Sequence, residues 1–254
     1  MEKIESIKEL RKKCQPNAEA SLFIDKIYRK ISIYVTKLFL YTPITANQVT
    51  FLMMLVGILS AVFYIKGEYF YSLFAIFLFH IYILLDFVDG EVAKYRKQFT
   101  RRGAYLDLMS HIIINPLLIM GMAIGSYNNN PFPIPDSAFI VAGFIGAYSL
   151  LMLNFMSLKK YEMYVKENDF SILKKAGKVF YERDRNDKWD IKKSLFSRFK
   201  SQISSLAGFR HFNLMFYFTI FNLVPLLVLF NAVLFGFSAL IKFYRSYRYI
   251  DELY

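Results

Sequence analysis

Apolar residues gather in long blocks separated by polar segments. A membrane-spanning helix needs about 20 apolar residues. Four blocks approach or meet that length: residues 49–65, 69–85, 104–124 and 137–158. A fifth block, 212–243, is too long for one span, and Asn222 and Pro225 near its middle predict a tight break between two short helices, at 210–223 and 226–244. The pattern therefore predicts an all-α polytopic membrane protein with six transmembrane helices.

The segment before the first block has a different periodicity. Within residues 18–46, apolar side chains recur every three or four positions, with basic side chains between them. This spacing predicts an amphipathic helix lying in the membrane interface. An amphipathic helix packed on a soluble core would show the same spacing and is the alternative. Residues 1–17 are polar and lack the apolar core of a signal peptide, so we expect a retained N-terminus.

Basic residues alternate with the apolar blocks. All but one of the 32 Lys and Arg residues lie in four segments: 1–48, 94–102, 159–211 and the tail after 241. The positive-inside rule then places both termini and these loops in the cytoplasm, most simply at the cell (inner) membrane. A nucleic-acid-binding protein has no reason to alternate its charge in this way, so the net charge of +12 does not indicate nucleic acid.

Composition agrees with a membrane protein. Hydrophobic residues make up 56% of the 254 positions, above the 45–50% that is typical of soluble domains. The single cysteine, Cys14, excludes an intrachain disulfide framework and a cysteine-rich metal cluster.

Three acidic residues lie at or inside the ends of predicted spans, where ionisable groups indicate function. Asp86 and Asp89 share one helix face, and Asp107 shares a face with His111 at i+4. The short basic connector 94–102 makes the two helices antiparallel neighbours, so we expect the three carboxylates and the imidazole to converge. Close carboxylates need a cation, and oxygen ligands suit Mg²⁺ or Mn²⁺. The spacing predicts metal-assisted handling of a diphosphate, with His111 taking a proton from a hydroxyl.

Read as one string, residues 86–111 closely resemble the signature of the CDP-alcohol phosphotransferase family, D-x2-D-G-x2-A-R-x8-G-x3-D-x3-D. Six of its eight fixed positions match: Asp86, Asp89, Gly90, Ala93, Gly103 and Asp107. Thr45 to Thr50 (TANQVT) is similar to the family's Thr-Pro-Asn-x-x-Thr segment, with Ala46 in place of Pro. Six spans after an interfacial helix also match the architecture of this family.

The resemblance implies a transferase of phospholipid biosynthesis. It would move a phosphoalcohol group, usually phosphatidyl from CDP-diacylglycerol, to the hydroxyl of an acceptor alcohol and release CMP. The resemblance implies that Asp86, Asp89 and Asp107 bind Mg²⁺ or Mn²⁺, and that the final position, His111 here, is the base. It further implies substrate-binding roles for four positions: Gly90, Ala93, Lys94 and Gly103. It also implies a homodimer, while the acceptor alcohol and the donor lipid stay open.

On this interpretation the chain has four parts. Residues 1–17 form a polar cytoplasmic N-terminus, and 18–46 the interfacial helix. Residues 47–245 form the six-helix catalytic domain, with a cytoplasmic loop at 159–209. Residues 246–254 form a cytoplasmic tail.

Two positions depart from the signature. Lys94 replaces Arg. This keeps the charge but loses the bidentate hydrogen bonding of a guanidinium to phosphate, unless Arg96 also contacts the phosphate. His111 replaces the last Asp, which removes a negative charge from the metal site. These departures motivate an alternative, a degenerate member of the family that binds CDP-lipid or cytidine nucleotide without turnover. A cation transporter ranks last, because the acids gather at one level rather than through the membrane.

Overall fold

The structure, a computed structural model, describes residues 4–16, 23–98, 100–166 and 209–248. These residues form helices and connecting turns, with no strand among them. The helices are α1 (Ile7–Cys14), α2 (Phe23–Leu40), α3 (Ala46–Ile65), α4 (Tyr69–Arg96), α5 (Arg101–Asn128), α6 (Asp136–Lys166), α9 (Phe209–Ile220) and α10 (Val224–Arg248). The predicted all-helical class is therefore confirmed for the described part of the chain.

Five of these helices are long and apolar enough to cross a membrane: α3, α4, α5, α6 and α10. The predicted break in the last apolar block is confirmed, since α9 ends at Ile220, Asn222 has a positive φ of 56°, and α10 begins at Val224. The described part of α9 has only 12 residues, which is shorter than a bilayer crossing. The sixth span therefore stays a prediction.

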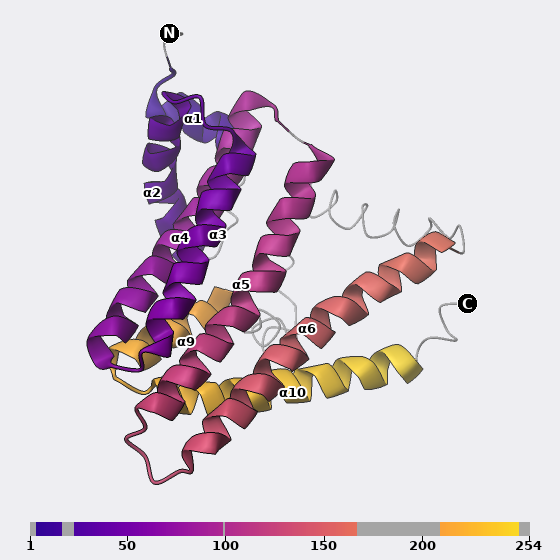
Figure 1. Ribbon diagram of the computed structural model, residues 1–254. Helices are drawn as coiled ribbons and strands as arrows, with labels where there is room; N and C mark the ends of the chain where they lie inside the picture. The colour runs from indigo at the N-terminus through magenta and orange to yellow at the C-terminus, as the bar shows by residue number, and fades with distance from the viewer. Residues whose placement is uncertain (1–3, 17–22, 99, 167–208, 249–254) are drawn as a thin grey trace, which may run out of the picture.

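The long helices pack as neighbours in a bundle (Figure 1). Helix α3 contacts α4 and α5, α5 contacts α6, and α6 contacts α10. Small residues allow α3 and α5 to approach closely: a Cβ atom at Gly121 would lie 2.5 Å from the carbonyl oxygen of Ala61. This tight contact fixes α5 against α3.

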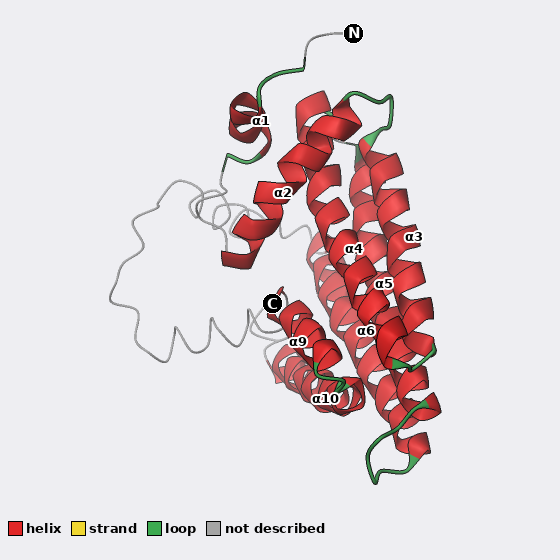
Figure 2. Ribbon diagram, turned by 90° about the vertical axis from the view of Figure 1, so that its left-hand side faces the viewer, coloured by secondary structure: helices red, strands yellow, loops and turns green. Residues whose placement is uncertain are grey.

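The helix predicted within residues 18–46 is present as α2, and it packs against α4 (Figure 2). One side of α2 leaves large apolar side chains exposed at helical spacing: Ile27, Ile31, Tyr34 and Leu38. Its position in a membrane interface stays a prediction. Helix α6 continues to Lys166, into the predicted loop 159–209, and α10 continues to Arg248, into the predicted tail 246–254. The rest of this loop before Phe209, and the rest of the tail, lie outside the described residues.

A short helix, α1, lies in the segment predicted only as a polar N-terminus. Ser6 and Glu9 form a capping box at its start. Its apolar side, Leu10 and Cys14, is fully buried together with Ile33 of α2. The capping-box pair and the three- and four-residue spacing of Ile7, Leu10 and Cys14 are signals in the sequence that could have revealed this helix.

Candidate active site

The cytoplasmic connector predicted between the second and third spans is a tight turn. Helix α4 ends at Arg96, and Lys97 adopts a left-handed conformation with φ 54°. Thr100 caps α5, since its hydroxyl accepts a hydrogen bond from the Gly103 amide at 2.9 Å. The chain reverses here, but α4 and α5 pack mainly against α3 rather than against each other, so the prediction that they are direct neighbours was wrong. Only their side chains approach one another at this end of the bundle.

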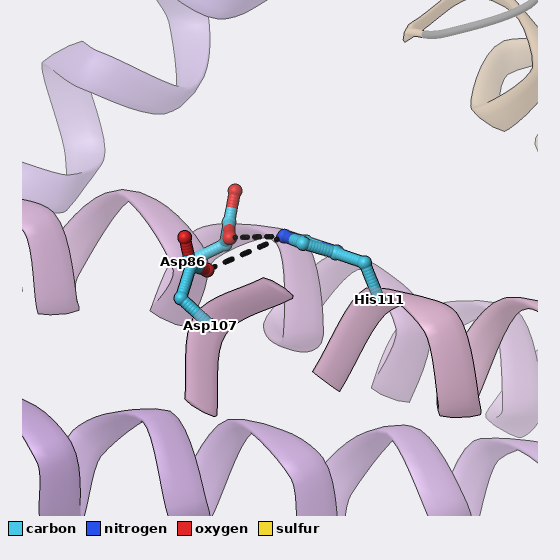
Figure 3. A group of neighbouring side chains, drawn as sticks. All are labelled: Asp86, Asp107 and His111. Atoms are coloured by element: carbon cyan, nitrogen blue, oxygen red, sulfur yellow. Dashed lines mark ion pairs between the residues drawn. The ribbon is translucent and has the colours of Figure 1, made fainter. Parts of the chain in front are cut away.

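Asp86, Asp107 and His111 meet at this junction (Figure 3). The Nε2 atom of His111 lies 3.0 Å from an oxygen of Asp86 and 3.5 Å from an oxygen of Asp107. One ligand atom from each residue lies within 4.8 Å of the others. The predicted convergence of α4 and α5 is therefore found for two of the three carboxylates and for the imidazole.

Asp89 is not part of this group. Its side chain is buried, and one of its oxygens accepts a hydrogen bond of 2.6 Å from the hydroxyl of Thr50 on α3. Thr50 is the last residue of the TANQVT segment. The segment thus contacts the acidic motif directly.

Tyr82 is a site residue that sequence analysis missed. It lies one turn before Asp86 on α4, and its hydroxyl is 2.8 Å from Nδ1 of His111. The phenol is almost fully buried and stacks on Phe79. An interior tyrosine one turn from a motif aspartate is a signal that could have found it.

The small residues of the motif have different surroundings. A Cβ atom at Gly90 would meet no atom within 4 Å, so there is open space beside this face of α4. At Gly103 a Cβ would lie 2.7 Å from the side-chain oxygen of Asn47. Gly103 therefore lets the start of α5 approach the start of α3, and Gly90 leaves room for a ligand. Ala93 packs partly against the core.

The basic residues of the motif point away from the carboxylates. The Lys94 ammonium donates a hydrogen bond of 3.2 Å to the carbonyl of Cys14, at the end of α1. The Arg96 guanidinium donates to the carbonyls of Ile44 and Thr42, each at 2.6 Å. Arg96 therefore holds the loop between α2 and α3, rather than assisting Lys94.

Glu91 links α4 to both N-terminal helices. One of its oxygens accepts hydrogen bonds from Gln15 at 2.6 Å and Ser32 at 2.5 Å, and the other accepts from Thr36 at 2.7 Å. The carboxylate is almost fully buried, so these donors replace its hydration. Burial among these groups raises the pKa of the neighbouring Cys14 thiol to about 11, with the charge of Glu91 adding to the effect.

The donor set fits a divalent cation. Two carboxylates held this close repel each other unless a positive charge lies between them, and here the His111 imidazole occupies that position. Carboxylate oxygens and an imidazole nitrogen are ligands that divalent metals accept. The arrangement defines the class: a polytopic membrane protein with a carboxylate-rich site formed by side chains of two spans that both pack on α3.

Comparison with protein families agrees with this class. The family model for CDP-alcohol phosphatidyltransferases matches residues 43–179, which is more than half of the chain. The chain therefore belongs to the CDP-alcohol phosphatidyltransferase family, whose members are membrane transferases of phospholipid synthesis that generally use divalent metals. No curated protein matches the sequence.

Proposed function

We propose that this protein transfers a phosphoalcohol group, specifically phosphatidyl from CDP-diacylglycerol, to the hydroxyl of an acceptor alcohol and releases CMP. The observation that carries the proposal is the meeting of Asp86, Asp107 and His111 where the motif halves on α4 and α5 face each other. Family membership supports the reaction class.

Asp86 and Asp107 would hold the metal, with Asp89 beside them. The proposal retains Asp89 because it lies one turn from Asp86 on the same helix. The Thr50 hydroxyl bonds to only one of the two Asp89 carboxylate oxygens, so the other oxygen can face the metal. A bound Mg²⁺ or Mn²⁺ supplies neutralising charge for the donor diphosphate.

The remaining motif residues would bind the donor. The open space beside Gly90 suits the nucleotide, and Ala93 and Gly103 keep the neighbouring helix surfaces small. Lys94 would turn from the Cys14 carbonyl to the donor phosphate, since its flexible stem can reorient an ammonium.

The transfer step is a nucleophilic substitution at phosphorus. The acceptor oxygen forms a bond to the phosphorus that carries the lipid. The bond from that phosphorus to the bridging oxygen breaks, and its electron pair leaves with CMP. The acceptor hydroxyl also loses a proton, which the sequence-based prediction assigns to His111. Because both ring nitrogens of His111 already have partners, this role stays a prediction.

The location of the site follows from the charge pattern. The basic segments on alternate loops support a cytoplasmic active site at the cell membrane. The exposed apolar side of α2 supports its place in the interface, beside the route by which a lipid donor would enter. A homodimer is part of the proposal by family resemblance.

One alternative function has a specific observation in its favour. The last motif position is His111, and its Nε2 lies against the carboxylates that would bind metal. A protein in which this contact is permanent would bind CDP-lipid or cytidine nucleotide without turnover.

The experiment is incubation of purified full-length protein with CDP-diacylglycerol and Mn²⁺ against a panel of alcohols, with products identified by mass. The proposal predicts one phospholipid product and an equal amount of CMP, both greatly reduced in Asp89→Ala. Nucleotide binding without product for any alcohol supports the alternative instead. A rate in Asp89→Ala equal to wild type contradicts the metal assignment.

A further inference from the structure

The side chain of His111 is oriented as a metal ligand is. We propose that His111 binds the catalytic metal through Nε2, together with Asp86 and Asp107, and that this mixed nitrogen and oxygen site prefers Mn²⁺ to Mg²⁺. The inference rests on the proposed function, because it concerns the metal of the same site. It departs from the base role that the sequence suggests for His111.

The position of Nε2 supports a metal-binding role. It is the ring nitrogen that faces the two carboxylates, at 3.0 Å from Asp86 and 3.5 Å from Asp107. A cation held by both carboxylates at ordinary coordination distances would therefore lie within reach of Nε2. Figure 3 shows the imidazole approaching the two carboxylates edge-on, with Nε2 leading.

The other ring nitrogen of His111, Nδ1, also has a partner. A metal-binding histidine almost always hydrogen-bonds through its second nitrogen, which fixes the tautomer and the ring orientation. Here Nδ1 lies 2.8 Å from the hydroxyl of Tyr82, and the two rings meet edge to face. Tyr82 is 1% exposed, so the phenol cannot easily turn away. When a metal is bound, Nδ1 would keep its proton and donate it to Tyr82, which would leave the lone pair of Nε2 for the cation.

Helical spacing places these four residues in two pairs. Tyr82 and Asp86 are one turn apart on α4, and Asp107 and His111 are one turn apart on α5. Each helix thus contributes a carboxylate, and the two remaining residues form a pair in which Tyr82 supports His111. Two helices that both pack on α3 therefore present the ligand set without any loop residue.

Metal preference follows from the ligand atoms. Mg²⁺ favours oxygen ligands and an octahedral shell with several waters, whereas imidazole suits transition metals. Replacing the final Asp of the signature with His therefore weakens the site for Mg²⁺ relative to Mn²⁺. An Nε2 that binds metal has no lone pair for a proton, so the proton of the acceptor passes to a carboxylate or to water.

The test is electron spin echo envelope modulation of Mn²⁺ bound to purified full-length protein, without substrate. The proposal predicts modulation from a directly coordinated ¹⁴N. His111→Asp gives an all-oxygen site as the matched control, and it should bind Mn²⁺ without this modulation. His80→Gln removes an imidazole elsewhere on α4 and should keep it.

A competition titration measures the preference. Wild-type protein should bind Mn²⁺ more tightly than Mg²⁺, and His111→Asp should reduce the ratio of the two affinities about tenfold. Tyr82→Phe should keep the ¹⁴N modulation and weaken Mn²⁺ binding about tenfold, because the ring loses its support.

The outcomes separate the two proposals. If wild-type protein binds Mn²⁺ without ¹⁴N modulation, or if the modulation persists in His111→Asp, His111 is not a ligand while the carboxylate metal site stands. If neither wild-type protein nor His111→Asp binds Mn²⁺, the metal site itself is lost, and the proposed function fails with it.

Discussion

The hydroxyl of Thr50 donates a 2.6 Å hydrogen bond to the carboxylate of Asp89, which joins the first turns of α3 to the acidic motif on α4. Both side chains are buried, so the bond is shielded from water. Through this bond, the TANQVT segment orients a carboxylate of the acidic motif.

Thr50→Val should lower the transfer rate about tenfold, since partners of metal-binding carboxylates typically contribute this much. Valine keeps the shape of threonine but removes the donor to Asp89. The measurement is the steady-state rate of CMP release. Thr50→Ser keeps a hydroxyl and should retain most of the activity; equal losses in both variants would mean that packing, not the hydrogen bond, is responsible.

Glu91→Ala should lower the free energy of unfolding by about 3 kcal/mol, because three donors from α1 and α2 lose their buried acceptor. Thermal unfolding in detergent measures the loss. Glu68→Ala is the matched control, since Glu68 is exposed on the same helix and makes no capping hydrogen bond. Similar melting temperatures for the two variants would contradict the linking role of Glu91.

Cys14 should resist alkylation at pH 8. Burial raises the pKa of its thiol from its ordinary value of 9.0 to about 11, which lowers the thiolate fraction about a hundredfold. Because the raised pKa disfavours the thiolate, labelling should increase as pH rises toward 11. Cys14 is the only cysteine, so mass spectrometry of the intact protein after iodoacetamide measures this directly. Rapid labelling at pH 8 would show that α1 does not stay packed on α2 and α4.

Lys94→Arg should lower the KM for the CDP-linked donor about fivefold, because a guanidinium binds phosphate through two hydrogen bonds. The variant restores the residue of the family signature. Lys97→Arg, in the turn that follows, is the control and should leave the KM unchanged. A KM for Lys94→Arg equal to that of wild type would place Lys94 outside the donor site.

Much of the fold could be predicted from the sequence, because membrane helices obey a strong length and hydropathy constraint. The apolar blocks correspond to α3, α4, α5 and α6, and the break near Asn222 separates α9 from α10. Helix α1 was missed because the hydropathy constraint on spans does not apply to it, although its capping box and apolar spacing are helical signals. A helix of eight residues is marginal alone, and tertiary contacts stabilise it, with Leu10 in the core and Gln15 bonded to Glu91.

The sequence predicted which residues of the candidate site share a helix face, but it did not predict which partner each side chain contacts. Helical spacing placed Asp86, Asp107 and His111 on facing surfaces, and the structure brings them together. The same spacing put Asp89 with them, yet its carboxylate contacts Thr50. Spacing along one helix does not reveal which partner a neighbouring helix offers, so this hydrogen bond and the one from Tyr82 needed the structure.

The central claim is that Asp86 and Asp107 form the metal site of a transferase that uses a CDP-linked donor. The most direct measurement is CMP release from CDP-diacylglycerol by wild-type protein and by Asp86→Asn, each with Mn²⁺ and after chelation by EDTA. The account predicts release by wild-type protein only when metal is present, and a loss of at least about a hundredfold in Asp86→Asn. CMP release that continues in EDTA, or that is unchanged in Asp86→Asn, would contradict it.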